Sequence, residues 1–412
     1  MARITCTAGG RFEGRVFFPY VLLYTTLYGG FGIMSPFLPT LLQARGLGAQ
    51  EIGLVLASST LIRLVTGPLA GRVADLLNAL RAVLATFALA ATLCGLGFLP
   101  ARTFWLVLSV SVLYAAALAP LTTIADALAL AAAGPPSGPE RHFEYGWVRG
   151  AGSAAFILGS LAAGEAIAAV GLNAIVWGSA AMLAAAAGAA PLVLERRAAR
   201  TRRKPGAGDS LGALLRLRSF RLLLVVAALV LGSHAMHDAF AMIRWKAAGI
   251  SPLMASVLWS ESVAAEVLVF VLAGPPLLDR FGPVVAMAVA ACAGTLRWSV
   301  MAVTANVVVM ALNEPLHGLS FALLHLACMR LIANLVPAGL AATAQAIYGT
   351  VAVGAGTALV TLASGALYGR FGAGGFWVMA ALCMSALPVI AALRRTVGAD
   401  EKHDQNNQSA MS

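Results

Sequence analysis

Residues 103–133 read TFWLVLSVSVLYAAALAPLTTIADALALAAA, a continuous apolar run that holds one charged residue, Asp126. An apolar run of ~20 residues spans a bilayer core as a helix, because backbone groups in lipid must be hydrogen-bonded within their own segment. The run does not alternate polar with apolar residues, as the strands of outer-membrane barrels do. It therefore predicts a transmembrane helix.

About twelve such runs fill the chain of 412 residues, which is 60% hydrophobic and only 11% charged. Soluble chains carry about 25% charged residues, so this chain could not cover itself with a polar surface in water. Breaks at proline, glycine and charged residues place the runs near 16–42, 50–75, 80–100, 103–133, 143–170, 173–194, 220–246, 251–277, 283–303, 305–335, 339–369 and 373–394. The predicted fold class is an all-α membrane protein with twelve transmembrane helices in two pseudo-symmetric six-helix bundles.

One long polar stretch separates the two sets of six. Residues 196–221 contain nine basic residues, and such a density favours the cytoplasmic side of a membrane. Six spans on each side put both termini there too, so we expect a multi-pass inner-membrane protein with cytoplasmic ends. The net charge of +11 is then explained by basic loops on the cytoplasmic side, and it does not indicate a nucleic-acid partner. The predicted domains are an N-terminal bundle of 1–194, a basic cytoplasmic linker of 195–219, a C-terminal bundle of 220–394 and a cytoplasmic tail of 395–412.

An internal repeat supports two equivalent halves. Asp279 lies 204 residues after Asp75, and Tyr348-Gly349 lies 203 residues after Tyr145-Gly146, each pair in matching spans. Transporters are often built from such repeats, with the substrate bound near the bilayer midplane between them. We therefore expect a transporter whose partners are a small-molecule substrate, protons and the lipid bilayer, and which functions as a monomer.

The sequence lacks the motifs that are typical of several other classes of protein. Five cysteines are scattered without paired spacing, so neither a disulfide framework nor a metal site is predicted. The sequence has no phosphate-binding glycine loop, no His-Glu-x-x-His and no Gly-x-Ser-x-Gly. We expect no cofactor, no ATP-driven pump and no intramembrane enzyme. No removable signal peptide is expected before the first span.

Charged residues inside the spans carry the functional signal. An ionisable group at membrane depth costs roughly 2.5 to 3.5 kcal/mol on insertion scales, so each needs a partner, a water-filled cavity or a task. Arginine suits an anionic or polyhydroxylated substrate because its planar fork binds a carboxylate bidentately. The alternative is structural: Arg63 or Arg149 forms a buried pair with Asp126, while Arg244 and Lys246 reach the outer interface.

The tenth span suggests a proton site. Glu314 and His317 lie three residues apart and hence on one helix face, His325 lies two turns further on, and Arg297 of the ninth span is close enough in sequence to approach them. A carboxylate held by an arginine stays ionised, whereas one left alone in an apolar cavity binds a proton. Glu314 and Arg297 are thus expected to couple protons to transport, unless Glu314 and His317 simply bond each other for packing.

Six blocks carry a resemblance to a known family. They are EYGWVRGAGSAAFILGSLAAG (144–164), GSHAMHDAFAMIRWKAAG (232–249), LWSESVAAEVLVF (258–270), LRWSVMA (296–302), LHGLSFALLHLACMRLIA (316–333) and AQAIYGTVAVGAGTALVTLASGALYGRFG (344–372). Together they resemble the phenylpropionate permease branch of the major facilitator superfamily, near the nucleoside and lactose proton symporters. The resemblance runs from about Tyr20 to Arg394 and implies symport of a small organic solute with protons by alternating access.

The resemblance also implies roles for individual residues. Arg149, which follows FEYG, looks like the substrate-binding arginine of the lactose permease, and proton work in the tenth helix is likewise a feature of that relative. The expected proton-coupling residues are Glu314, His317, Arg297 and His325. The expected substrate-binding residues are Arg149, Asp126, Arg63, His234, Asp238 and Gln345.

This chain also departs from the family pattern. His237-Asp238 stand where the branch usually has two tyrosines, and Arg244, Lys246, Glu261 and Glu314 are additional charges, so a more polar cavity is expected. The superfamily's loop signature is incomplete after the second span, where Leu76 and Asn78 replace its basic residue and glycine, and better kept at 279–282. The residues expected to act in gating are Asp75, Arg81, Asp279 and Arg280.

The leading hypothesis is therefore proton-driven uptake of an aromatic or other small carboxylate. The same architecture permits a proton-driven exporter of a drug or metabolite. A membrane sensor or an assembly factor would keep the fold without needing coupling residues, and the retained Arg149, Arg297 and His317 argue against it.

Overall fold

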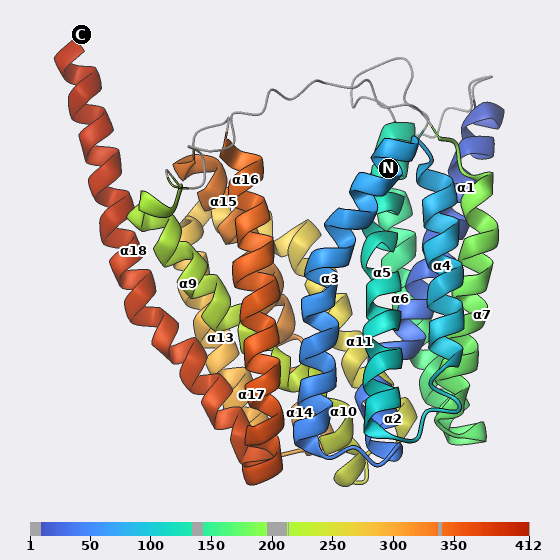
Figure 1. The fold of residues 1–412 in the computed structure, drawn as a ribbon. Helices are drawn as coiled ribbons and strands as arrows, with labels where there is room; N and C mark the ends of the chain where they lie inside the picture. The colour runs from blue at the N-terminus through green and yellow to red at the C-terminus, as the bar shows by residue number, and fades with distance from the viewer. Residues whose placement is uncertain (1–9, 134–142, 196–211, 213, 337–339, 412) are drawn as a thin grey trace. The chain divides into compact units, whose positions relative to one another are not determined.

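The structure is a computed structural model that describes residues 10–133, 143–195, 212, 214–336 and 340–411. In these ranges every regular element is a helix (Figure 1). Ten helical stretches are long and apolar enough to span a membrane. One of them, Ala341–Val397, is long enough for two spans, because it joins the helical run 341–371 to the helix that begins at Phe376. The apolar helix Leu80–Leu96 adds a further span. The predicted all-α membrane fold is confirmed, and these stretches are consistent with twelve spans.

Contacts within the chain divide it into two compact units. Unit 1 comprises Met1–Leu47, Ser58–Thr201 and Ser251–Ser260, and unit 2 comprises Gly48–Ala57, Arg202–Ile250 and Glu261–Ser412. The helices up to the linker are α1 (Gly10–Met34), α2 (Leu38–Ala44), α3 (Ala49–Leu77), α4 (Leu80–Leu96), α5 (Phe104–Ala133), α6 (Tyr145–Val170), α7 (Asn173–Ala189) and η1 (Ala190–Leu192).

The helices after the linker are more often interrupted. They are α9 (Arg218–Gly232), α10 (Ala235–Ala247), α11 (Pro252–Leu268), η2 (Val269–Ala273), α12 (Gly274–Phe281), α13 (Pro283–Val303), α14 (Val307–Asn313), η3 (Gly318–Leu323), α15 (Leu324–Leu335), α16 (Ala341–Ile347), η5 (Tyr348–Ala355), α17 (Gly356–Phe371), η6 (Gly372–Gly375) and α18 (Phe376–Met411). Most of the predicted spans therefore lie within a few residues of observed helices.

Small residues let the helices of unit 1 approach each other closely. Helix α1 packs against α6 and α7. A Cβ added at Gly32 would lie 2.1 Å from the Phe156 carbonyl oxygen, and one added at Gly159 would lie 2.6 Å from that of Gly29. Because any side chain would collide with the facing backbone, glycine at both positions allows α1 and α6 to pack backbone to backbone.

Breaks in the helices of unit 2 lie beside its buried polar residues. Helix α14 ends at Asn313, and Pro315 follows, which has no N–H to donate and collides with the carbonyl four residues earlier. The chain then resumes in η3, a wide helical turn of the π type, as are η2 and η5. A further break separates α9 from α10 at 233–234. Turns of this kind are often found at functional sites because they re-aim side chains.

Candidate substrate and proton sites

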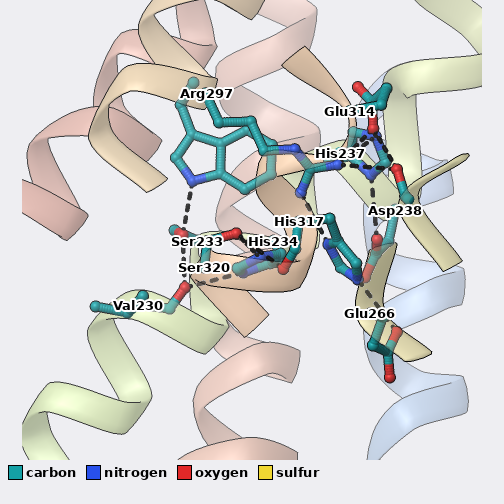
Figure 2. A network of polar contacts seen from close by, with 12 residues as sticks. Val230, Ser233, His234, His237, Asp238, Glu266, Arg297, Glu314, His317 and Ser320 are labelled. Carbon is teal, nitrogen blue, oxygen red and sulfur yellow. Dashed lines mark hydrogen bonds and ion pairs between the residues drawn. The ribbon is translucent and has the colours of Figure 1, made fainter. Parts of the chain in front are cut away.

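A buried ion pair joins α13 to the break after α14. Arg297 Nη2 lies 2.6 Å from Glu314 Oε2, and both side chains are 0% exposed (Figure 2). The Ser262 hydroxyl of α11 donates to the same carboxylate oxygen, and the guanidinium lies 4.5 Å from the centre of the Trp298 ring. Removing one partner of such a pair costs about 3 to 5 kcal/mol, because the other charge is left buried and uncompensated. The pair and Ser262 therefore link three helical segments, and the loss of either charge would destabilise that link.

Two histidines flank this pair. His317 Nδ1 lies 2.9 Å from Arg297 Nη1, and arginine can only donate, so Nδ1 accepts and the ring proton belongs on Nε2, which lies 3.4 Å from Glu266 Oε2. His237 Nε2 lies 3.2 Å from Glu314 Oε2, and its Nδ1 lies 3.4 Å from Asp238 Oδ1. Each histidine thus connects the buried pair to a second carboxylate.

Exposure increases outward through this group of six residues, which we call the Arg297 cluster: Arg297, Glu314, His237, His317, Asp238 and Glu266. The ion pair is fully buried, and the His237 and His317 side chains are 3% and 14% exposed. The outer carboxylates of Asp238 and Glu266 are 57% and 28% exposed. The cluster is therefore a polar chain that begins at accessible carboxylates and ends at a closed ion pair.

The two remaining histidines that we expected in the site lie outside this cluster. His234 is buried, with Nδ1 3.0 Å from the Val230 carbonyl oxygen and Nε2 3.1 Å from the Ser320 hydroxyl, so both its nitrogens have protein partners. His325 Nδ1 lies 3.1 Å from the Tyr348 hydroxyl. Gln345 is exposed on α16. His234 touches the edge of the cluster, because Ser320 also donates to the His317 carbonyl oxygen at 3.4 Å and the His234 and His317 rings lie 5.2 Å apart, centre to centre. Among the described contacts, His325 and Gln345 share none of the hydrogen bonds of the cluster.

In unit 1, tyrosines surround the expected substrate residues. Asp126 Oδ1 accepts hydrogen bonds from Tyr24, at 2.5 Å, and from Tyr145, at 3.0 Å. The Arg149 guanidinium lies 4.6 Å from the centre of the Tyr28 ring, and its Nη1 lies 3.4 Å from the Ser153 hydroxyl. Within the described side chains, neither Arg149 nor Arg63 forms a salt bridge with Asp126. The buried pair that we held as an alternative is therefore absent from this conformation.

Arg63 faces a cavity of about 390 Å³ in unit 1. Apolar side chains make most of its wall, and the polar ones come from four positions; the lining residues are Phe31, Met34, Ser35, Leu38, Arg63, Tyr114, Leu118, Ala119 and Thr122. The Phe31 ring lies 5.5 Å from the Tyr28 ring, centre to centre, and Tyr28 lies against Arg149. The cavity and the Arg149 group are therefore neighbours in one unit.

Comparison with known proteins identifies the family. Over residues 18–379 the chain matches the model of the MFS_1 like family. It is 33% identical to a probable 3-phenylpropionic acid transporter of Escherichia coli (strain K12), across 88% of this chain and 94% of that one. The chain belongs to the MFS_1-like family of the major facilitator superfamily. Such proteins are multi-pass membrane transporters and not enzymes.

Further relatives agree with this family. The chain is 26% identical to the maltose permease of Geobacillus stearothermophilus, across 93% of this chain and 96% of that one. The solved structure of the nucleoside transporter NupG matches with a TM-score of 0.78 at 16% identity, covering 92% of this chain and 98% of that one. A human organic anion transporter matches with a TM-score of 0.63 at 16% identity, covering 92% and 99%. At these identities the structural likeness concerns the fold alone.

The four expected gating residues of this major facilitator protein form different contacts in the two units. Arg81 Nε lies 2.9 Å from Glu195 Oε2, and Glu195 also accepts from the backbone N–H of Leu80. Asp279 pairs at 2.9 Å with Arg330, and both are largely exposed. Asp75 is exposed, and Arg280 lies 5.2 Å from the Phe281 ring centre. The exposed Asp279–Arg330 pair contributes little stability, whereas the Glu195 side chain is only 17% exposed and accepts from both Arg81 and Leu80.

The additional charges of this major facilitator protein differ in burial. Arg244 is buried and donates to the Thr304 carbonyl oxygen at 2.6 Å, whereas Lys246 is exposed. Only Lys246 thus fits the alternative in which both reach the interface. Tyr24 and Tyr28 contact charged residues of unit 1, Ser262 contacts one of unit 2, and none of the three was predicted from the sequence. The two tyrosines could have been recognised from their i, i+4 spacing, which places them on one face of a helix.

Proposed function

We propose that this protein is a proton-coupled symporter that takes up a small carboxylate, aromatic or otherwise, across the inner membrane. The observation that carries the proposal is the fully buried Arg297–Glu314 pair with a histidine on either side. In the proposal both termini are cytoplasmic, residues 1–194 and 220–394 are the two bundles, and the monomer is the functional unit.

Proton coupling is proposed because the charge of Glu314 depends on whether Arg297 lies beside it. While Arg297 holds Glu314, the carboxylate keeps its charge, because an opposite charge and the Ser262 hydroxyl stabilise it. A movement of α13 away from the break after α14 would leave that buried carboxylate without its positively charged partner, and the cost of burying an uncompensated charge then favours the protonated form. A carrier that reorients only with Glu314 in one of these forms couples solute to protons.

The substrate side rests on the cavity of unit 1. Its volume of about 390 Å³ lies at the small end of the range for ligand pockets, roughly 300 to 1,000 Å³. Phe31, Met34 and Leu118 offer apolar surface for a ring, and Arg63 offers a permanent positive charge for a carboxylate. A sugar would require many more hydrogen-bonding side chains than this wall provides. The cavity therefore favours the substrate type of the phenylpropionic acid relative over that of the maltose permease.

Transport by purified protein in proteoliposomes tests the proposal, with radiolabelled 3-phenylpropionate as the probe. We expect an acidic exterior to drive accumulation above the level in protein-free liposomes, which control for diffusion of the undissociated acid. A protonophore should abolish the protein-dependent part. Accumulation driven by an acidic interior would instead identify a proton antiporter, the exporter alternative. Uptake that ignores the pH gradient, or that requires sodium, would refute proton symport.

A further inference from the structure

We propose that Asp238 and His237 form the proton route to Glu314, with Asp238 as the entry point. The proposal rests on the proposed function, because it takes Glu314 to be the group that binds the transported proton. It gives Asp238 a task that differs from the substrate binding expected from the sequence.

The first argument is that Glu314 is closed to solvent. Its side chain is 0% exposed, and its Oε2 has three partners: Ser262, Arg297 and His237. Its other carboxylate oxygen is also buried. Arginine does not give up its proton in proteins, and a buried serine hydroxyl is a poor acid. Of the three, His237 alone can both accept a proton and pass one on near neutral pH.

The second argument is the geometry of His237. Its two ring nitrogens lie near different carboxylates, Nε2 3.2 Å from Glu314 Oε2 and Nδ1 3.4 Å from Asp238 Oδ1 (Figure 2). Nε2 also lies 3.2 Å from Arg297 Nη2, which can only donate, so Nε2 carries a proton toward Glu314 once the guanidinium has moved away. A proton from Asp238 bonds to Nδ1 while the proton on Nε2 passes to Glu314 Oε2. The Nε2–H bond breaks as the O–H bond forms, and the ring ends neutral with its proton on Nδ1. One proton enters and one leaves, so the relay is balanced.

The third argument is accessibility. The Asp238 side chain is 57% exposed, whereas the His237 side chain is 3% exposed. A carboxylate that faced lipid would be costly, so we take the exposed side of Asp238 to meet water, whereas a proton reaches Glu314 only through a neighbour. The other charged groups that face this relay are Arg297 of α13, Glu261 of α11, His234, which precedes α10, and His317, which precedes η3.

The second histidine of the Arg297 cluster offers no equivalent route. His317 connects Glu266 to Arg297, not to Glu314, and its Nδ1 accepts a hydrogen bond from the guanidinium. A proton passed along this branch would arrive at a group that is already protonated and permanently charged. The two branches thus resemble each other in composition but differ in their last member, because only His237 also lies against Glu314.

Kinetics of the full-length carrier in proteoliposomes test the relay, with 3-phenylpropionate as the probe. In Asp238→Asn and His237→Gln we expect the initial rate of proton-driven uptake to fall by about 100-fold, within the range that positioned proton-transfer groups contribute. Exchange of internal for external substrate, which needs no net proton transfer, should continue at the wild-type rate. External formate, a small weak acid, should partly restore uptake in Asp238→Ala but not in His237→Gln. Glu165→Gln, at an exposed carboxylate of α6, serves as the control that should leave uptake unchanged.

Three results would refute the proton relay, and they differ in whether they also refute the coupling role of Glu314. Wild-type uptake by Asp238→Asn, in a series in which Glu314→Gln has lost accumulation, would refute the route while leaving proton symport at Glu314 intact. Loss of exchange as well as uptake in Asp238→Asn, with the protein still folded, would make Asp238 a substrate ligand. Normal accumulation by Glu314→Gln would refute the coupling role of Glu314 and the relay together.

Discussion

Arg149 lies on a helix face with aromatic and hydroxyl neighbours, and within the described part of unit 1 it has no carboxylate partner. An arginine at this depth without a salt bridge is costly unless it serves a ligand. We predict that Arg149→Ala weakens binding of 3-phenylpropionate at least about tenfold, since a hydrogen bond to a charged group is worth about 1.5 to 3 kcal/mol. Equilibrium binding to the detergent-solubilised protein measures this.

Arg149→Lys is the informative companion variant. Lysine keeps the charge but presents a compact ammonium in place of the planar fork, so it should bind nearly as poorly as the alanine variant. Both variants should insert and purify like the wild type. An unchanged affinity in Arg149→Ala would make the residue a structural arginine that packs on Tyr28.

At the level of single residues, the sequence indicated which charges matter better than how they are paired. The rule that charges at membrane depth need partners singled out Arg297 and Glu314, which the structure brings together. The same rule suggested Arg149 or Arg63 as a partner for Asp126, which instead accepts hydrogen bonds from two tyrosines. Phenol groups carry no charge pattern along a sequence, so their part in satisfying Asp126 becomes apparent only in the folded unit.

The glycines of α6 give a test at the level of helices. A Cβ on Gly159 would lie 2.6 Å from the Gly29 carbonyl oxygen, whereas one on Gly150 of the same helix would meet nothing within 4 Å. We predict that Gly159→Ala destabilises unit 1 by about 1 to 3 kcal/mol, the usual result of overpacking. Thermal unfolding in detergent should show a lower midpoint for Gly159→Ala than for Gly150→Ala. Equal midpoints would mean that α1 and α6 adjust without cost.

Helix positions were predicted well, and helix interruptions were predicted poorly. The fifth predicted span, 143–170, is observed as α6, Tyr145–Val170, because apolar runs bounded by polar and glycine residues define spans directly. The break between α9 and α10 at 233–234 contains no proline from which it could have been predicted. It depends on Ser233 and His234, whose side chains bond to Trp298, Val230 and Ser320 instead of leaving the helix regular. Such breaks arise from tertiary packing.

On the scale of the whole molecule, we propose that the Arg63 cavity and the Arg149 group of unit 1 recognise the substrate and that the Arg297 cluster of unit 2 handles the proton. Apolar runs bounded by proline, glycine and charged residues could predict two sets of six spans, because each run is a local signal. It could not predict that the start of α3 belongs with unit 2 and the start of α11 with unit 1, since unit membership depends on contacts between residues distant in the chain.

The most direct test of the central claim compares exchange with accumulation in Glu314→Gln. Glutamine keeps an oxygen that can accept from Arg297 and Ser262 but cannot take up or release a proton. We predict that the variant still binds 3-phenylpropionate and exchanges internal for external substrate, which shows that it is folded and reorients, but no longer accumulates substrate when the exterior is acidic. Accumulation at the wild-type level by Glu314→Gln would contradict the account and place the coupling proton on another residue.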